Sequence, residues 1–212
     1  MSRLLNLTQC PFFKEVGDVK VTTDYGKDIK DYPTKGKTGD HWGIDCVRST
    51  ENNNSKSATI VSPLNGTVTA QRKYVKDGEK SPSGGNCVYI ISDDHHYLFI
   101  FLHLKEGSVP DFIKDGSRIN KGDMIGIMGN TGYSFGVHLH FQVEYIENPP
   151  EVIDHTTRGV PIDPEPYITG EVPFPDTCKY GVILSYDTEQ EAREIALALK
   201  VLGLNPTLAE VE

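Results

Sequence analysis

Residues 86–104 read NCVYIISDDHHYLFIFLHL, two strongly apolar runs with a short polar segment between them. Both runs are rich in Val, Ile, Tyr and Phe, the residues that strands favour. The polar DDHH of residues 93–96 is typical of the connection in a hairpin. The stretch therefore predicts two adjacent antiparallel strands, over residues 86–92 and 97–104.

Shorter segments of the same kind lie on both sides of this hairpin. We expect strands over residues 19–23, 44–47, 59–61 and 67–72, around residue 119, and over 124–128 and 137–145. Twenty glycines and thirteen prolines supply turns between such strands and fit them better than long helices. The sequence predicts a mainly β fold with an antiparallel sheet at its core.

We expect the core to end at Pro149-Pro150 and the proline-rich segment 161–166, and the pattern changes beyond residues 170–176. Residues 179–186 suggest a strand, and Thr188-Glu-Gln-Glu191 has the form of a capping box that begins a helix. A further strand over 204–212 would complete a β-α-β pattern. The chain is expected to have three parts: a main domain over residues 1–170, a linker over 171–177 and a small tail over 178–212. Because the tail is too small to bury a core alone, we expect it to dock on the main domain, to self-associate or to bind a partner.

The composition excludes several classes of function. A net charge of −9 provides no basic stripe for phosphates, so nucleic acid is not expected as the main partner. No stretch approaches the ~18–20 apolar residues that would span a bilayer, so we expect no membrane insertion. The N-terminus lacks the apolar run of a signal peptide, which predicts synthesis in the cytoplasm without an export address.

The cysteines do not indicate a metal or redox site. Cys10, Cys46, Cys87 and Cys178 are far apart and form no C-x-x-C pair. We expect buried free thiols in a reducing compartment.

Two short clusters carry the residue types of a metal site. His41 and Asp45 lie in HWGID, and His138 and His140 lie in HLH. On a strand, alternate side chains share a face, so His138 and His140 point together, opposite an apolar row at 137, 139, 141 and 143. Two imidazoles and one carboxylate are a ligand set that catalytic Zn²⁺ uses while a fourth position stays open. One histidine is then left for chemistry.

The remaining histidines divide into two groups. His103 ends an apolar strand, where an imidazole is costly unless it has a partner, so it is a further candidate. His95 and His96 lie in the predicted hairpin connection and His155 lies in a threonine-rich loop. We expect these three on the solvated surface.

These residues, in this order, resemble the lysostaphin/LytM-type zinc endopeptidases that cut peptidoglycan peptides. The matching segments are residues 19–26, 41–45, 62–68, 85–90, 103–104, 109–126, 129–132, 136–141 and 162–167. The resemblance implies a flattened, barrel-like antiparallel sheet. It also implies that His41, Asp45 and His140 bind one Zn²⁺ and that His103 and His138 are the catalytic histidines.

The implied reaction is hydrolysis of peptide bonds in peptidoglycan stem peptides or cross-bridges. One histidine would take a proton from water, and the other would stabilise the oxyanion or protonate the leaving amine. The sequence does not assign these two roles. Without a signal peptide, release would be that of a phage lysin or a virion-associated tail enzyme, or delivery by a specialised bacterial system. The tail faintly resembles half of a SPOR-type peptidoglycan-binding domain.

Three positions depart from the family pattern. Phe101 stands where tyrosine is frequent, Phe135 where the residue is usually small, and Gln142 where glutamate is common. We expect these differences to affect contacts with substrate and to leave every ligand in place.

Two alternative functions remain open. A non-catalytic LytM-type scaffold that activates other wall hydrolases would share the fold, but such proteins typically lose ligands. A lipoyl or biotinyl carrier would explain the barrel-like repeats at 62–68 and 119–126. A carrier needs a lysine at a hairpin tip, which does not stand out, and it leaves the histidines unexplained.

Overall fold

The computed structural model describes residues 3–5, 10–15, 17–27, 41–50, 53–54 and 57–175. The chain divides into two units, Met1–Cys178 and Lys179–Glu212. The predicted β-α-β tail, its proposed self-association and Cys178 lie outside the described residues.

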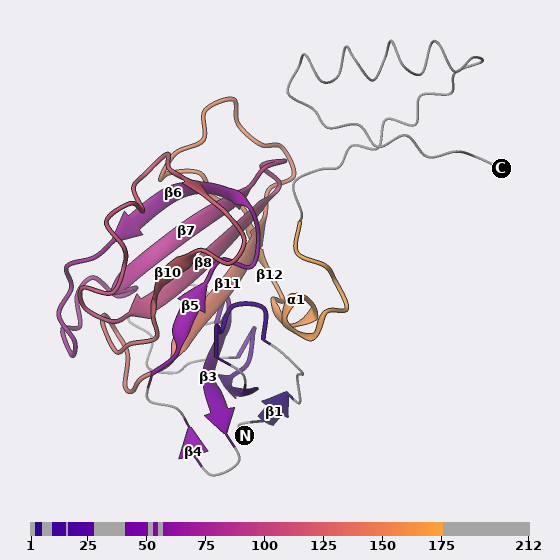
Figure 1. The fold of residues 1–212 in the computed structure, drawn as a ribbon. Coiled ribbons are helices and arrows are strands. Elements are labelled where there is room, and N and C mark those ends of the chain that lie inside the picture. The colour runs from indigo at the N-terminus through magenta and orange to yellow at the C-terminus, as the bar shows by residue number, and fades with distance from the viewer. Residues whose placement is uncertain are drawn as a thin grey trace, which may run out of the picture. The chain divides into compact units, whose positions relative to one another are not determined.

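The regular secondary structure of the described residues is almost entirely antiparallel β, as the sequence predicts (Figure 1). The strands are β1 (Arg3–Leu5), β2 (Asp18–Thr23), β3 (Ile44–Thr50), β4 (Asn53–Asn54), β5 (Thr59–Val61), β6 (Gly66–Arg72), β7 (Asn86–Ser92), β8 (Tyr97–Leu104), β9 (Arg118–Ile119), β10 (Met124–Ile127), β11 (Leu139–Tyr145) and β12 (Val160–Ile162), and the described helix is α1 (Glu165–Thr169). The hairpin of β7 and β8 has the predicted bounds.

The large sheet has the strand order β1-β2-β3-β11-β8-β7-β6-β9, with β4 added on β3 and β12 on β11. β11 is its central strand. Along one edge its first half pairs with β3, where Leu139 faces Cys46, and its second half pairs with β12, where Val143 faces Ile162. The other edge pairs with β8 from His140 to Tyr145. Hydrogen bonding on both edges fixes the position of every residue of β11.

An aromatic cluster belongs to the main core, which also includes Ile60 of β5 and Ile125 of β10, the two strands of the smaller sheet. Phe99 and Phe101 are alternate residues of β8, and Phe141 of β11 lies directly opposite Phe101, so all three fully buried rings share one face. The ring centroid of Phe141 lies 4.9 Å from that of Phe12 and 5.2 Å from that of Phe101. A second, smaller apolar cluster, with Ile91, Leu98, Ile100 and Ile146, occupies the opposite face.

The core does not end at the proline-rich segment, so that expectation is wrong. β12 includes Pro161 and joins the large sheet through β11. Proline is tolerated there because β12 pairs only with β11 among the described strands, and its missing N–H faces away from the ladder. The helix α1 that follows buries Tyr167 and Ile168 in the main core.

The described cysteines are buried free thiols, as expected. Cys10, Cys46 and Cys87 form no disulfide. Burial raises the pKa of Cys10 to about 12 and that of Cys87 to about 11, so these thiols stay protonated and unreactive.

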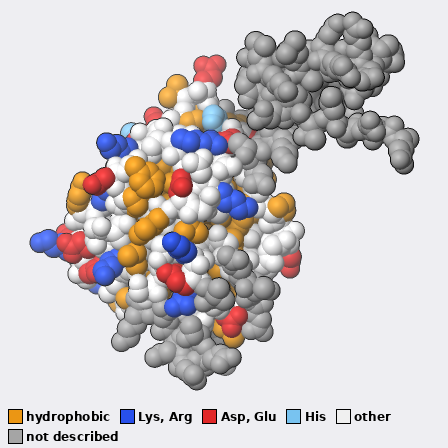
Figure 2. Space-filling view, viewed as in Figure 1, with side chains coloured by type: hydrophobic (Ala, Val, Ile, Leu, Met, Phe, Trp, Pro, Cys, Tyr) orange, Lys and Arg blue, Asp and Glu red, His pale blue; other side chains and the backbone are white. Residues whose placement is uncertain are grey.

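The face of the molecule drawn in Figure 2 carries acidic and basic side chains interspersed with apolar ones, with no gathering of one sign. Within the described part of the chain, no helix has the length and apolar character needed to cross a bilayer.

Removing one ring from the aromatic cluster tests this description of the core. We expect Phe99→Ala to lower the free energy of unfolding by about 3–5 kcal/mol, because it leaves a cavity beside Phe141, Tyr167 and Phe174. Urea denaturation measures the change. Tyr74→Ala, at a side chain that is 86% exposed, is the control and should change stability by less than about 0.5 kcal/mol. Similar losses in the two variants would contradict the assignment of Phe99 to the core.

Candidate active site

The pairing of β3 with β11 brings the two predicted clusters together. In the register of these strands Asp45 lies directly opposite His140. His41 lies just before β3, where its backbone is held by the turn after β2 through hydrogen bonds with Gly26 and Lys27. Residues almost a hundred positions apart thus become neighbours.

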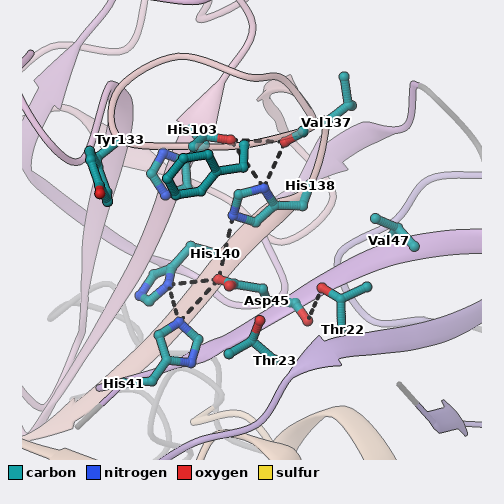
Figure 3. A pocket seen from close by; sticks show the side chains of 13 residues that line it. Thr22, Thr23, His41, Asp45, Val47, His103, Tyr133, Val137, His138 and His140 are labelled. Atoms are coloured by element: carbon teal, nitrogen blue, oxygen red, sulfur yellow. Dashed lines mark hydrogen bonds and ion pairs between the residues drawn. The ribbon is translucent and has the colours of Figure 1, made fainter. Parts of the chain in front are cut away.

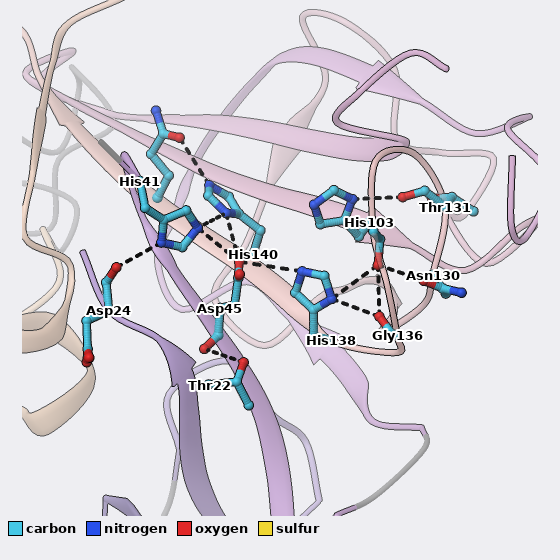
Figure 4. A network of polar contacts seen from close by, with 12 residues as sticks. Thr22, Asp24, His41, Asp45, His103, Asn130, Thr131, Gly136, His138 and His140 are labelled. Atoms are coloured by element: carbon cyan, nitrogen blue, oxygen red, sulfur yellow. Dashed lines mark hydrogen bonds and ion pairs between the residues drawn. The ribbon is translucent and has the colours of Figure 1, made fainter. Parts of the chain in front are cut away.

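Three atoms of these residues form a nearly equilateral triangle (Figure 4). His41 Nε2 lies 3.0 Å from His140 Nδ1, and Asp45 Oδ1 lies 3.1 Å from each of these nitrogens. Both imidazoles are buried and the carboxylate is partly exposed. Among the described residues, the cluster with the geometry of a metal site consists of His41, Asp45 and His140.

The hydrogen bonds around the triangle show that no hydrogen occupies its centre. His41 Nδ1 lies 3.0 Å from the carbonyl oxygen of Asp24, which only accepts, so the hydrogen of this ring is on Nδ1. His140 Nε2 donates to Gln142 Oε1 at 3.2 Å. The facing atoms, His41 Nε2 and His140 Nδ1, therefore both present lone pairs, beside a carboxylate oxygen. Three converging lone pairs fit a cation.

The size of the triangle also fits a small tetrahedral ion. Bonds of about 2.0–2.1 Å to Zn²⁺ give ligand–ligand edges of about 3.3 Å in a tetrahedron. The observed edges of 3.0–3.1 Å are close to that value. Burial alone would raise the pKa of Asp45, but its close contacts with the imidazoles of His138, His140 and His41 lower it well below the usual range, so the carboxylate is ionised.

Gly43 is required by this strand pairing. A Cβ atom at this position would lie 2.5 Å from the carbonyl oxygen of Phe141 and 2.8 Å from His140 Nε2. Such contacts would displace the opposing strand, so the glycine allows β3 and β11 to approach.

His103 reaches the site through a β-bulge. Simple alternation would place it on the core face with Phe99 and Phe101. However, Asn86 and Val88 of β7 are two positions apart, whereas the β8 residues paired with them, Leu104 and Phe101, are three positions apart. β8 therefore carries one extra residue at this point. His103 has a φ of 62°, a conformation that is uncommon for a residue other than glycine. The bulge turns its ring away from the core, as bulges near active sites often do.

The rings of His103 and His138 lie side by side, with centroids 4.8 Å apart. His103 Nδ1 donates to the carbonyl oxygen of Thr131 at 2.7 Å, and His138 Nδ1 donates to that of Gly136 at 2.8 Å. His138 Nε2 lies 3.5 Å from Asp45 Oδ1. Both rings are thus held through Nδ1, which leaves Nε2 for chemistry.

The two rings differ in charge. Burial, together with the neighbouring His138 and His140, lowers the pKa of His103 from 6.5 to about 3, so it is neutral near pH 7. Burial also acts to lower the pKa of His138, but the hydrogen bond and negative charge of Asp45 outweigh it and raise this pKa.

All five predicted site residues line one open pocket (Figure 3). The pocket is lined by Thr22, Thr23, His41, Asp45, Val47, His103, Tyr133, Ser134, Phe135, Gly136, Val137, His138 and His140. Val137, which alternation predicts in the apolar core row, is instead 36% exposed at the pocket, because β11 begins only at Leu139.

Of the three departures from the family pattern, only Phe135 lines the pocket, at whose rim it is 82% exposed. Phe101 is buried in the core, and Gln142 lies behind His140. The expectation that these two affect contacts with substrate is therefore wrong. The signal in the sequence is alternation along the strand, which places Gln142 on the same face as His140.

The other histidines lie away from the pocket. His155 is exposed, as expected. His95 and His96 are half-buried, so both are partly at the surface, but His96 is also held by partners that the surface prediction does not include. His96 Nδ1 donates to the carbonyl oxygen of Ile146 at 2.8 Å, and its ring stacks on Tyr145.

Comparison with known proteins agrees with this geometry. Residues 39–164 match the model of peptidase family M23. The chain belongs to this family. The matched segment contains His41, Asp45, His103, His138 and His140.

Curated relatives of this member of family M23 include two named as endopeptidases. It is 30% identical to glycyl-glycine endopeptidase ALE-1 of Staphylococcus capitis, over 52% of this chain and 26% of that protein. It is 29% identical to the peptidoglycan DD-endopeptidase ShyC of Vibrio cholerae serotype O1, over 52% of this chain and 22% of that protein. The chain thus spans about a quarter of the length of these curated relatives.

Among solved structures, the catalytic domain of lysostaphin from Staphylococcus simulans is similar to this M23 peptidase. The two chains are 23% identical with a TM-score of 0.47, over 70% of this chain and 90% of that one.

The low pKa of His103 predicts a pH dependence of stability in metal-free protein. The unfolded chain binds a proton at His103 near pH 6.5 and the folded protein only near pH 3, so stability is lost as the pH falls below 6.5. At pH 5 the loss from this residue is about 2 kcal/mol. His103→Asn, which tolerates the positive φ, should therefore lose less stability between pH 7.5 and pH 5 than the parent protein.

Chemical denaturation in the presence of a chelator measures this difference. His155→Asn, at an exposed position, is the control and should follow the parent protein. Equal losses in the parent protein and in His103→Asn would show that His103 does not resist protonation.

Proposed function

We propose that this M23 peptidase is a zinc-dependent endopeptidase that cleaves peptide bonds in the stem peptides or cross-bridges of peptidoglycan. The observation that carries the proposal is the triangle of lone pairs of His41, Asp45 and His140, with His103 and His138 beside it in one open pocket. Relatives named as a glycyl-glycine endopeptidase and a peptidoglycan DD-endopeptidase support the substrate class.

The ligand set supports zinc as the metal. Two imidazole nitrogens and one carboxylate oxygen leave a fourth position free, which is the arrangement of catalytic zinc sites. Zinc bound there would polarise the scissile carbonyl and lower the pKa of a water molecule toward about 7.

The two catalytic histidines have environments suited to different tasks. His103 is neutral, and its Nε2 is free of hydrogen and can accept a hydrogen bond because Nδ1 donates to Thr131. It therefore suits the orientation of an attacking water and acceptance of its proton. His138 holds a proton more readily because of Asp45, so it suits donation to the oxyanion or to the leaving amine.

The pocket lining is consistent with an uncharged stretch of peptide. Outside the five site residues the lining consists of threonines, a serine, a glycine, valines and two aromatic side chains, and it includes no lysine or arginine. Tyr133 and Phe135 pack edge to face, with centroids 5.2 Å apart, and Lys80 lies 5.0 Å from the Phe135 centroid. This aromatic pair would contact the apolar parts of a bound peptide.

The alternative functions are less consistent with the site. A non-catalytic scaffold has no need of the triangle or of two histidines held through Nδ1. A lipoyl or biotinyl carrier leaves the whole pocket unexplained. That the protein reaches the cell wall as a phage lysin or a virion-associated enzyme stays a prediction.

Metal content and activity test the proposal together. The wild-type protein should contain about one zinc per chain and release new amino termini from purified peptidoglycan. His140→Ala should lose both, because it removes one corner of the triangle. His155→Ala, at an exposed histidine outside the pocket, should retain both. A wild-type protein without zinc that leaves walls of every cross-link type intact would refute the proposal.

Separating metal binding from catalysis tests the role of His138. His138→Ala should retain zinc and lose activity by ~10²–10⁴-fold, the usual contribution of general acid–base catalysis. Zinc analysis and the rate of amino-terminus release give the two readouts. Loss of zinc in this variant would mean that His138, and not His140, is the ligand.

A further inference from the structure

A line of buried polar side chains runs along β11 behind the metal triangle. His140, Gln142 and Glu144 are alternate residues, so they share a face of the sheet, and each is at most 5% exposed. His140 Nε2 donates to Gln142 Oε1 at 3.2 Å, and Gln142 Nε2 donates to Glu144 Oε1 at 2.6 Å. These hydrogen bonds form one continuous chain.

The hydrogen-bond series ends at Glu144, whose carboxylate accepts hydrogen bonds from backbone and side-chain donors. The backbone N–H of Gly159 donates to Glu144 Oε2 at 2.9 Å, and Arg158 forms an ion pair with the same carboxylate. Arg158 Nε donates to Glu144 Oε2 at 2.9 Å. The Glu144 side chain is 1% exposed, so the ion pair keeps a buried carboxylate satisfied.

The donor-to-acceptor direction of these hydrogen bonds, from His140 through Gln142 to Glu144, is set by Glu144. A carboxylate only accepts hydrogen bonds, so the amide of Gln142 must turn its NH₂ group toward Glu144. Its carbonyl oxygen then faces His140 Nε2, which must carry the hydrogen of that ring. The lone pair of His140 consequently lies on Nδ1, the corner of the triangle.

A reversed amide would have the opposite effect. If Gln142 turned its NH₂ group toward His140, Nε2 would have to accept and the hydrogen would move to Nδ1. An N–H would then point at the position of the metal. A glutamine can adopt either orientation, whereas a carboxylate at position 142 could only accept.

The contribution to stability does not account for the burial of His140, Gln142 and Glu144 on this face. Apolar side chains pack the same face on the neighbouring strand, where Ile100 lies opposite Gln142 and Leu98 lies opposite Glu144. Burying an ion pair often stabilises a fold less than apolar residues of similar volume would. The polar line therefore needs another reason.

We propose that Gln142 is a positioning residue whose amide, oriented by Glu144, keeps the hydrogen of His140 on Nε2 and its lone pair on Nδ1 toward the metal. The proposal rests on the metal-binding role given to His140 under the proposed function. Partners that orient metal-bound histidines typically change metal affinity by 10–100-fold when removed.

Exchanging the two side chains gives a sharp test. Glu144→Gln should reverse the direction of the hydrogen bonds between His140, Gln142 and residue 144. Gly159 and Arg158 still donate to the side-chain oxygen at position 144, so the new amide turns its NH₂ group toward Gln142. The amide of Gln142 then flips. The double variant Gln142→Glu with Glu144→Gln restores the direction, because the carboxylate introduced at position 142 can only accept from His140. The double variant also keeps the net charge of the parent.

Two readouts follow the effect. Competition with a chelator should show that Glu144→Gln binds zinc 10–100-fold more weakly and that the double variant returns to within about threefold of the parent. In metal-free protein, nitrogen chemical shifts of the His140 ring should place the hydrogen on Nε2 in the parent and the double variant and on Nδ1 in Glu144→Gln. Ile100→Val, opposite Gln142, is the control for a small packing loss and should change neither readout.

The outcomes separate the possibilities. Parental zinc affinity and an unchanged ring hydrogen in Glu144→Gln would overturn the proposal, as would a folded double variant that restores neither. If Glu144→Gln does not fold, Gln142→Met removes the acceptor while leaving Glu144 paired with Arg158, and the same weakening is expected. If the parent binds no zinc, the proposed function fails, while the chemical shifts of the metal-free proteins still decide whether Glu144 sets the direction.

Discussion

The site depends on the register between β3 and β11. That register places Asp45 opposite His140, and the same ladder brings the turn that holds His41 to the edge of β11. A shift by one residue would turn His140 of β11 into the core and Phe141 toward solvent. The register is secured on the opposite edge by β8 and, further along, by β12. A large part of the sheet therefore serves to hold one cross-strand pair in place.

The core and the site are opposite faces of the same strand. Phe141 packs among the aromatic rings, while its neighbours His140 and Gln142 point the other way. Because alternate side chains of β11 point to opposite faces, the packing of Phe141 in the core also fixes the position of the ligand His140. The triangle itself adds little to folding in the absence of a cation, because its three lone pairs face each other without a hydrogen. Metal affinity and the stability of this region are consequently coupled.

Much of this arrangement can be predicted from the sequence. The hairpin of β7 and β8 follows from composition and a polar break, and the five site residues follow from the clusters, from His103 and from family resemblance. The bulge that turns His103 out of the core cannot be read from alternation, since it arises from the unequal pairing of β7 with β8. Strand β12 is not predicted because proline usually ends a sheet, although it is tolerated at an edge. The role of Gln142 depends on Glu144 and Arg158, and a linear motif does not show which polar side chains are buried together.

Gly43 has a consequence for how chains of this kind are recognised. The space that its missing side chain leaves is occupied by Phe141 and His140, which belong to the other motif. The two motifs are therefore sterically complementary parts of one unit, although they are distant in sequence. A homologue that keeps both histidine motifs but carries a bulky residue between the first histidine and the aspartate would not close its strands to this distance. Such a chain would contain the ligand residues in its sequence, but they would lie too far apart to bind one metal ion. The glycine therefore helps to separate metal-binding relatives from those that keep only the fold.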